Sequence, residues 1–325
     1  MKTVLVSGAS GIVGNGILRS LRLSGENYIL IGTTIYKNTI AECFSDIFEL
    51  APKTSDDNYI DWLCGIIRKH NVDMIIPGIE ADVAKWNENR SVLEKTGASV
   101  LLNNERLIRL CSDKWLFYLE LNKYKPAYAI PSTLDSDFDE IAEKYNLPFL
   151  MKPRSGSASR NIKKIFTREE FTDTKSEFND EIMAQPIIGN DDEEYTVSGF
   201  FDENSQLRAY QQLKRKLSKD GFTESAQTVN IKNIGEILND LADVFKPVGP
   251  TNFQFRGHDG SLKLLEINPR ISSSTSIRAG LGYNESQMSV DYILNGKDIE
   301  QPVLKSGKAI RYTEDKIVYD NSADI

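Results

Sequence analysis

The chain has 325 residues, of which 40% are hydrophobic and 26% charged, and this length accommodates two domains or one domain with a large insertion. Its 47 acidic residues outnumber its 39 lysines and arginines and give a net charge of −8. An acidic surface of this kind argues against sequence-independent binding to nucleic acid, which needs a basic one.

The composition also points away from membranes, secretion and histidine chemistry. No apolar stretch approaches the roughly 20 residues of a membrane span, and the chain begins in a strand pattern without the features of a signal peptide. The three cysteines, Cys43, Cys64 and Cys111, are too few for a zinc site and fit free thiols in a reducing compartment. With only His70 and His258 available, histidine-based catalysis is nearly excluded. We therefore expect a cytoplasmic protein that binds neither nucleic acid nor membrane.

Over the first hundred residues, apolar runs alternate with segments of helical period. The predicted strands are residues 3–6, 28–31, 72–76 and 99–102. The predicted helices are 12–23, 59–69 and 81–95. This alternation predicts a parallel sheet wrapped by helices, as in an α/β domain.

The remainder of the chain changes character. A helix over 106–121 carries Lys114, and a short unit follows with a helix at 138–145, strands at 148–152 and 161–166, and a capping box at Thr167 and Glu170 that opens another helix. From residue 181 the pattern is antiparallel, with strands at 181–185, 195–201, 207–213 and 226–231 and helices at 234–245 and 287–294. An α/β half followed by an α+β half is the predicted organisation.

Glycines at 8, 11 and 14 follow the first strand and open a helix, which is the context of a dinucleotide-binding turn. However, the second strand runs into Thr33 and Thr34, with no acidic residue to hold a ribose, and the only Tyr-x-x-x-Lys is Tyr210 to Lys214, inside a predicted strand. We interpret the glycines as a tight, closely packed turn. A retained nucleotide or anion site there is the alternative.

The segment from Asn252 to Arg270 predicts a hairpin with a polar face. With a three-residue loop of His258, Asp259 and Gly260, Asn252 lies opposite Glu266. Because side chains alternate along strands, four polar residues then share one face: Asn252, Gln254, Glu266 and Asn268. Such a set suits Mg²⁺ with phosphate oxygens, and a solvated surface hairpin is the alternative.

Lys152 ends a buried strand and is followed by the small residues Ser155, Gly156, Ser157, Ala158 and Ser159. A lysine beside a loop whose backbone N–H groups are unobstructed favours phosphate binding.

In their order along the chain, these motifs resemble the ATP-grasp superfamily, nearest to its carbamoyl-phosphate-synthetase-like branch of carboxylate–amine ligases. The resemblance covers nearly the whole chain. It implies a Rossmann-like pre-ATP-grasp domain at 1–104, a first lobe at 105–185 with both nucleotide lysines, and a second lobe at 186–325 with the metal site and a C-terminal extension. The fold class expected is therefore α/β and α+β, with a two-lobed ATP-grasp domain built on an antiparallel sheet.

The same resemblance implies the residues of the site. The nucleotide ligands it implies are Lys114, Lys152, Ser155, Gly156, Ser157, Ser159, Gln185, Ile187 and Glu194. The implied ligands of Mg²⁺, with Mn²⁺ as an alternative ion, are Gln254, Glu266 and Asn268. The implied catalytic residues are Arg215, Lys216 and Arg270, and the implied substrate residues are Arg270, Ser273, Ser274, Arg278 and Glu80, the last of which equally fits a helix cap. Two departures from the family are Pro186, where a glutamate is usual, and the serine-rich segment 271–276.

The resemblance implies an ADP-forming ligase that uses ATP to activate a substrate carboxylate as an acylphosphate for attack by an amine. Its partners would be small-molecule carboxylate and amine substrates, and a homo-oligomer is compatible with the sequence. Two alternatives are an NAD(P)-dependent nucleotide-sugar epimerase or reductase that uses the Gly8–Gly14 turn, and a non-catalytic grasp protein that only binds nucleotide.

Overall fold

The computed structural model describes residues 1–156, 162–178, 181–218 and 221–317. These residues form two compact units. Unit 1 comprises residues 1–102, 273–299 and the described residues from Ala309 onward, and unit 2 comprises 103–272 and 300–308. Residues 273–299 thus lie in the unit of the N-terminal sheet, whereas the sequence analysis grouped them with the second lobe.

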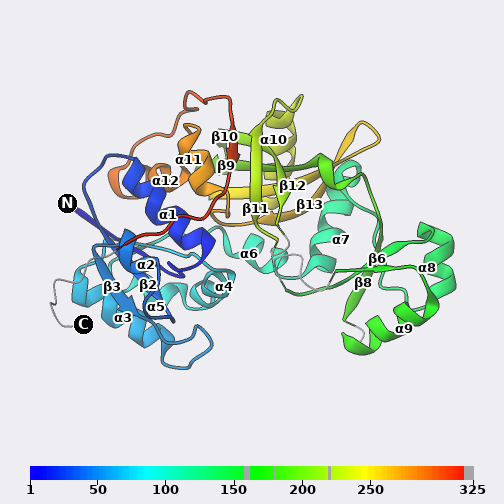
Figure 1. Ribbon diagram of the computed structural model, residues 1–325, viewed down its shortest axis with the longest axis horizontal. Coiled ribbons are helices and arrows are strands. Elements are labelled where there is room, and N and C mark those ends of the chain that lie inside the picture. The colour runs from blue at the N-terminus through cyan, green and yellow to red at the C-terminus, as the bar shows by residue number, and fades with distance from the viewer. Residues whose placement is uncertain (157–161, 179–180, 219–220, 318–325) are drawn as a thin grey trace. The chain divides into compact units, whose positions relative to one another are not determined.

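The sheet of unit 1 is parallel, as expected, with the strand order β3-β2-β1-β4-β5. Figure 1 labels β2 and β3 of this sheet. Its strands are β1 (Lys2–Val6), β2 (Tyr28–Thr34), β3 (Ile47–Leu50), β4 (Met74–Ile76) and β5 (Ser99–Val100). The apolar runs of β1, β2 and β4 are almost fully buried, which is typical of a parallel sheet covered on both faces. β3 was not predicted from the sequence; three of its four residues are only partly buried and Leu50 is exposed.

Seven helices belong to the described part of unit 1: α1 (Ile12–Leu23), α2 (Ala41–Phe44), α3 (Tyr59–His70), α4 (Glu80–Glu88), α5 (Arg90–Glu94), α11 (Thr275–Gly280) and α12 (Glu285–Asn295). Contacts along α1 hold α11 and α12 in this unit. A Cβ on Gly16 would lie 2.8 Å from Cγ2 of Thr275, and Asn284 Nδ2 donates to the carbonyl of Ser20 at 2.7 Å. The predicted helix 81–95 is divided at Asn89 into α4 and α5.

Close backbone packing accounts for the glycine-rich turn after β1. Gly8 has a φ of +56°, which favours glycine, and a Cβ on Gly14 would lie 2.4 Å from the carbonyl oxygen of Gly8. Gly78 also packs here, since its Cβ would lie 2.8 Å from Cα of Gly14. These contacts support the interpretation of a tight turn.

The first lobe of unit 2 contains the three-stranded antiparallel sheet β7-β6-β8. Its elements are α6 (Glu105–Cys111), α7 (Lys114–Tyr124), η1 (Pro126–Tyr128), α8 (Phe138–Tyr145), β6 (Phe149–Pro153), β7 (Lys163–Ile165), α9 (Arg168–Glu177) and β8 (Ile182–Pro186). Apolar residues of α8 and α9 pack against this sheet (Figure 1). The capping box at Thr167 is present, but the helix predicted over 106–121 is two helices, α6 and α7.

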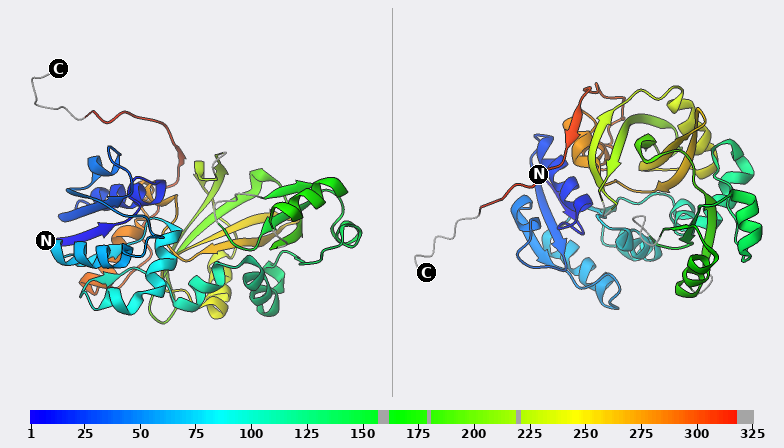
Figure 2. Two further views of the ribbon diagram at one scale, coloured as in Figure 1. Left: turned by 90° about the horizontal axis from the view of Figure 1, so that it is seen from below. Right: turned by 45° about the vertical axis from the view of Figure 1, so that its right-hand side comes forward.

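A six-stranded sheet forms the rest of unit 2, with the order β13-β12-β9-β10-β11-β14. Its elements are η2 (Asp191–Glu193), β9 (Glu194–Phe201), β10 (Leu207–Leu217), β11 (Thr223–Thr228), α10 (Ile234–Phe245), β12 (Gly249–His258), β13 (Ser261–Asn268) and β14 (Lys308–Ile310). The long, twisted strands are drawn from green to yellow in Figure 2. Helices α6, α7 and α10 cover the apolar face of the sheet, where Val197, Phe253 and Phe255 lie in the core. The opposite face carries the polar residues described next.

Among the residues that the structure describes, no helix is both long and apolar enough to span a bilayer.

Candidate functional site

Polar side chains of four neighbouring strands gather on the face of the six-stranded sheet that α10 does not cover. Residues paired across antiparallel strands project to the same side, so the pairing defines rows across the sheet. One row is Gln211, Ser198, Asn252 and Asn268. The adjacent row is Leu213, Thr196, Gln254 and Glu266, and Glu194 and Arg256 pair in the row after it. We call this surface the polar face.

The hairpin that supplies this face reaches its arrangement by a route that the sequence analysis did not predict. His258 pairs with Ser261, so the loop has two residues, Asp259 and Gly260, with φ of +48° and +72°. The expected three-residue loop was therefore wrong. A two-residue loop alone would put Glu266 on the other face, but the register shifts between Gln254 and Phe255, and Leu265 is the extra residue of a β-bulge. The four polar residues accordingly share one face, with Asn252 opposite Asn268 and Gln254 opposite Glu266.

A buried ion-pair cluster lies at one end of the polar face. The side chains of Glu194 and Arg215 are 7% and 5% exposed, and Arg215 Nη2 donates to Glu194 Oε1 at 2.6 Å. Arg256 Nη2 donates to the other carboxylate oxygen, Glu194 Oε2, at 2.7 Å. Arg215 also donates to Oε1 of Gln254. The Arg215 guanidinium is therefore hydrogen-bonded to two residues with different predicted roles. Glu194 was predicted to bind the ribose, and Gln254 was predicted to bind the metal.

Glu266 and Asn268 lie at the edge of this face on β13. Asn268 Nδ2 donates to Glu266 Oε1 at 2.9 Å, and Arg270 Nη1 donates to the carbonyl of Ile271 at 2.8 Å. Within the described residues there is no cluster of three or more His, Cys, Asp or Glu side chains that could hold a metal by themselves. The donor set is one carboxylate and amide oxygens, which fits Mg²⁺ bound together with phosphate rather than an all-protein metal cage.

Lys114 and Lys152 of the first lobe add positive charge to this environment. Lys114 Nζ donates to the carbonyl of Gly156 at 2.6 Å, which places it beside the loop after β6. Lys152 is partly buried, and desolvation followed by the charge of Lys114 lowers its pKa to about 8, whereas the carboxylate of Glu266 opposes this shift. Lys152 therefore responds both to the charge of Lys114 and to that of the predicted metal carboxylate, Glu266.

Asp113 and Arg154 support this arrangement, and the sequence analysis did not include them. Asp113 caps α7 by accepting from the backbone N–H groups of Trp115 and Leu116. Its other oxygen accepts from Arg154 Nη2 at 2.6 Å, and the backbone N–H of Lys114 donates to the carbonyl of Arg154 at 2.8 Å. The position of Asp113 directly before the helix of Lys114 could have predicted the cap. Its ion pair with Arg154 could not be predicted in this way, because Arg154 is 41 residues away in sequence.

The adenine linker predicted around Gln185 and Ile187 lies at the end of β8. The side chain of Gln185 is buried and its Nε2 donates to Ser132 Oγ at 2.6 Å, so this amide serves the first lobe. Ile187 is half-buried just beyond the strand, and Ser155 and Gly156 are exposed. The predicted phosphate-loop residues Ser157 and Ser159 lie outside the described residues.

Of the other predicted residues, one projects away from the polar face and four belong to unit 1. Lys216 is adjacent to Arg215 on β10, so its side chain projects to the other side, where it pairs with Glu224 at 3.2 Å and is 72% exposed. Arg278 is fully buried with Glu285 at 3.5 Å. The predicted substrate residues that belong to unit 1 are Glu80, Ser273, Ser274 and Arg278. Glu80 is the first residue of α4 and follows the N-cap, Ile79, so it does not occupy the capping position itself.

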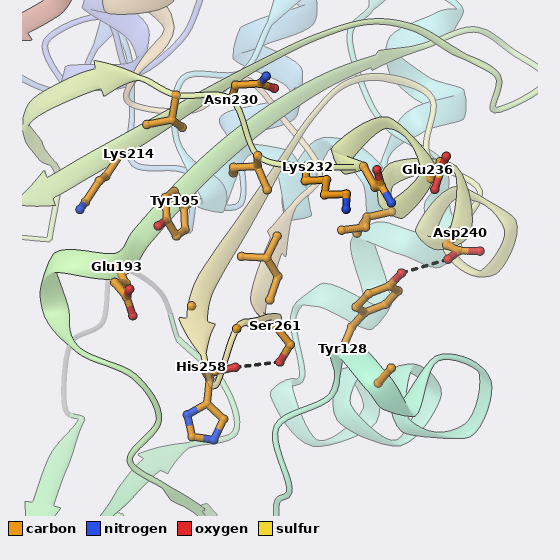
Figure 3. Close-up of a pocket in the computed structure, with 18 residues that line it drawn as sticks. Tyr128, Glu193, Tyr195, Lys214, Asn230, Lys232, Glu236, Asp240, His258 and Ser261 are labelled. Carbon is orange, nitrogen blue, oxygen red and sulfur yellow. Dashed lines mark hydrogen bonds between the residues drawn. The ribbon is translucent and has the colours of Figure 1, made fainter.

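A cavity of about 910 Å³ lies on the other side of the six-stranded sheet. Tyr195 and Lys214 line it from β9 and β10, and His258 and Ser261 line it from the β12–β13 hairpin (Figure 3). Because Tyr195 and Lys214 are adjacent in sequence to Glu194 and Arg215, they project to the side opposite the polar face. The convergence of lysines and carboxylate described above, rather than the size of this cavity, identifies the candidate site.

Known proteins share both sequence and fold with this chain. Residues 179–316 match the family described as ATP-grasp in the biosynthetic pathway with Ter operon. The carbamoyl phosphate synthase large chain of Methanothrix thermoacetophila is 22% identical over an alignment of 290 residues. The alignment covers 81% of this chain and 26% of that protein. The chain thus spans about a quarter of the length of this curated relative.

Two solved structures illustrate the shared fold. The N5-carboxyaminoimidazole synthetase of Staphylococcus aureus, complexed with ADP, has a TM-score of 0.73 at 16% identity, covering 93% of this chain and 80% of that one. The biotin carboxylase domain of the Hydrogenobacter thermophilus 2-oxoglutarate carboxylase, a dimer in complex with MgADP, ADP and bicarbonate, has a TM-score of 0.71 at 14% identity, covering 94% and 73%. The expected fold class is confirmed. Together, these comparisons show that residues 179–316 are similar to an ATP-grasp family and that the chain shares the fold of the two solved structures.

Proposed function

We propose that this protein is an Mg²⁺-dependent, ADP-forming ligase that activates a substrate carboxylate as an acylphosphate for attack by an amine. The observation that carries the proposal is the position of Lys152, whose pKa responds both to the charge of Lys114 and to the carboxylate of Glu266, while Lys114 donates to the carbonyl of Gly156 in the loop after β6. Two cations suited to a triphosphate and a carboxylate suited to its metal thus belong to one electrostatic environment. Neither an epimerase nor a reductase needs this combination.

The first lobe would hold the nucleotide. Lys114 and Lys152 would neutralise the phosphates, and Ser155 and the backbone around Gly156 would donate to their oxygens, together with Ser157 and Ser159. The backbone from Gln185 to Ile187 would receive adenine, since the Gln185 side chain is already bonded to Ser132. Glu194 would bind the ribose hydroxyls, with Arg215 and Arg256 orienting its carboxylate.

Glu266 and Asn268, with Gln254 beside them, would hold Mg²⁺, and Mn²⁺ would suit the same oxygen donors. When bound, the ion supplies charge neutralisation to the phosphate oxygens.

The reaction proposed has two steps. A substrate carboxylate oxygen bonds to the γ-phosphorus while the bond from that phosphorus to the oxygen of ADP breaks, giving an acylphosphate. The amine nitrogen then bonds to the acyl carbon, inorganic phosphate leaves, and the proton lost by the nitrogen ends on the phosphate. Arg270 would pair with the substrate carboxylate, and Arg215 would stabilise charge on the transferring group, because phosphoryl transfer depends mainly on positioning and charge.

Two experiments test this proposal, first nucleotide binding and then turnover. Calorimetry should detect MgATP but not NAD(P)⁺, and ADP release should then appear with a suitable pair from a panel of amines and acids. The acids are amino acids, peptides, sugar-linked carboxylates and bicarbonate.

Glu266→Ala should reduce ADP release by about 100-fold or more, as expected for losing a group that stabilises transition-state charge. The matched control is Glu300→Ala, which removes an exposed carboxylate of the same unit and should leave turnover unchanged. Full turnover by Glu266→Ala would remove this residue from the metal site. MgATP binding without ADP release under any mixture would instead favour a nucleotide sensor, and binding of NAD(P)⁺ alone would favour the epimerase alternative.

A further inference from the structure

Gln211 on β10 carries a buried side-chain amide. Its side chain is 1% exposed, and neither Oε1 nor Nε2 has a hydrogen-bond partner among the residues that the structure describes. The next residue provides a contrast, since Gln212 Oε1 accepts from the backbone N–H of Ile231 at 2.8 Å. A buried amide with two unsatisfied polar atoms lowers the stability of the folded state. Its presence therefore needs an explanation other than a contribution to folding.

The position of Gln211 on the polar face relates it to the proposed metal ligands. It pairs with Ser198, which pairs with Asn252, which pairs with Asn268. The Gln211 row is adjacent to the row of Gln254 and Glu266, on the side away from Glu194. Ser198 lies four residue positions after Glu194 on β9, a distance of about 13 Å along an extended strand.

This order along the strands suggests which part of the reaction Gln211 would meet. If the ribose lies at Glu194 and the metal-bound phosphates lie in the row of Glu266, the following row is where an acceptor would approach the terminal phosphate. The row also contains Asn252, whose Oδ1 accepts from Thr196 Oγ1 at 2.6 Å, so the surroundings of Gln211 are polar and buried.

We infer that Gln211 is a substrate-binding residue that positions the amine against the activated acyl group, an inference that rests on the proposed function. A primary amide presents one acceptor and two N–H donors in a plane. Oε1 accepts an N–H of the attacking amine, and Nε2 donates to an oxygen of the acyl group. The substrate class that satisfies both atoms is an amine whose N–H lies beside an oxygen acceptor in the reacting complex.

The unliganded protein provides the first test, because it separates a functional amide from a structural one. Gln211→Leu keeps the approximate volume and removes both unsatisfied atoms, so its melting temperature should equal or exceed that of the wild type. Gln212→Leu, which leaves the N–H of Ile231 without its partner, should melt lower. The exposed Gln227→Leu should melt as the wild type does. A lower melting temperature for Gln211→Leu would show that the amide stabilises the fold and would overturn the inference.

Kinetics with the acid–amine pair identified by ADP release provide the second test. Gln211→Leu and Gln211→Glu should raise the KM for the amine or lower kcat by about 10-fold or more, with MgADP affinity unchanged, because the lost contacts are made to the acceptor and not to the nucleotide.

Wild-type kinetics in an active Gln211→Leu variant would overturn only this inference. Absence of ADP release by the wild type with every pair would overturn the proposed function and the inference together. The two failures are therefore distinguishable.

Discussion

The side chain of Arg215 has more partners on the polar face than the sequence indicated. Among the three consecutive basic residues of β10, Arg215 projects to the polar face, whereas Lys214 and Lys216 project to the other side of the sheet. On the polar face, Arg215 bonds to both Glu194 and Gln254. We therefore expect Arg215 to contribute to stability as well as to the reaction.

Arg215→Ala should lower the free energy of unfolding by about 3–5 kcal/mol, since breaking a buried pair leaves a buried carboxylate with only part of its compensation. Urea denaturation measures the change. Lys216→Ala, which breaks the exposed pair with Glu224, is the control and should change stability by less than about 1 kcal/mol. Equal effects of the two substitutions would contradict the cluster.

Lys152 should make nucleotide binding depend on pH. Its folded-state pKa of about 8 lies below the ordinary lysine value of 10.5, so between these values the unfolded chain binds more protons and stability rises with pH. Phosphate oxygens favour the ammonium form, so MgATP binding above pH 8 should take up a proton, whereas binding at pH 6 should not.

Calorimetry in buffers of different ionisation enthalpy measures this uptake. Lys152→Met should abolish it, and Lys164→Met, at an exposed position of β7, should retain it. Uptake that persists in Lys152→Met would assign the proton to another group.

At the scale of elements, the beginning of α7 couples the helix to the loop after β6. Burial acts to raise the pKa of Asp113, but hydrogen bonds from Arg154 and from the first turn of α7 hold it below its usual value. The carboxylate therefore stabilises the fold above its unfolded-state pKa, and this contribution is lost as pH falls through the folded-state value.

Asp113→Asn should preserve the cap. Asp113→Ala should remove the cap and lower the free energy of unfolding by about 1–2 kcal/mol, which urea denaturation measures. Both should weaken MgATP binding, because both remove the charge that holds Arg154. Asp137 caps α8 in the same way, because its side chain accepts from the backbone N–H groups of Asp139 and Glu140. Asp137→Asn is therefore the control for nucleotide affinity. Unchanged affinity in Asp113→Asn would separate the cap from the site.

The β12–β13 hairpin shows what strand alternation does and does not determine. The alternation of polar residues correctly predicted which side chains share a face, because that grouping depends only on whether the register is odd or even. The loop length was wrong, because Asp259 and Gly260 both accept a positive φ and the bulge at Leu265 corrected the register. A glycine in a short polar turn is compatible with either loop.

At the scale of the whole molecule, the proposed function predicts that a nucleoside diphosphate stabilises the protein and that a dinucleotide does not. MgADP at about 100 times its Kd should add about 2.7 kcal/mol to the stability of the folded state. NAD⁺ and NADP⁺ at the same concentration should add nothing, because contacts within unit 1 already account for Gly8 and Gly14. Differential scanning calorimetry checks both, and stabilisation by NAD⁺ or NADP⁺ alone would reopen the dinucleotide alternative.

The sequence by itself determined the fold class and the parallel and antiparallel halves, because these follow from local periodicity. The grouping of Gln254, Glu266 and Asn268 was predicted from strand alternation, but it depends on the bulge at Leu265, which the sequence did not predict. The tertiary structure alone decided the partners that lie far apart in the chain. These are the pairing of Glu194 with Arg215 and Arg256, that of Asp113 with Arg154, and the assignment of residues 273–299 to unit 1. It also decided that Gln211 is buried without a hydrogen-bond partner among the described residues. Such contacts depend on how separate segments pack, and no local pattern encodes them.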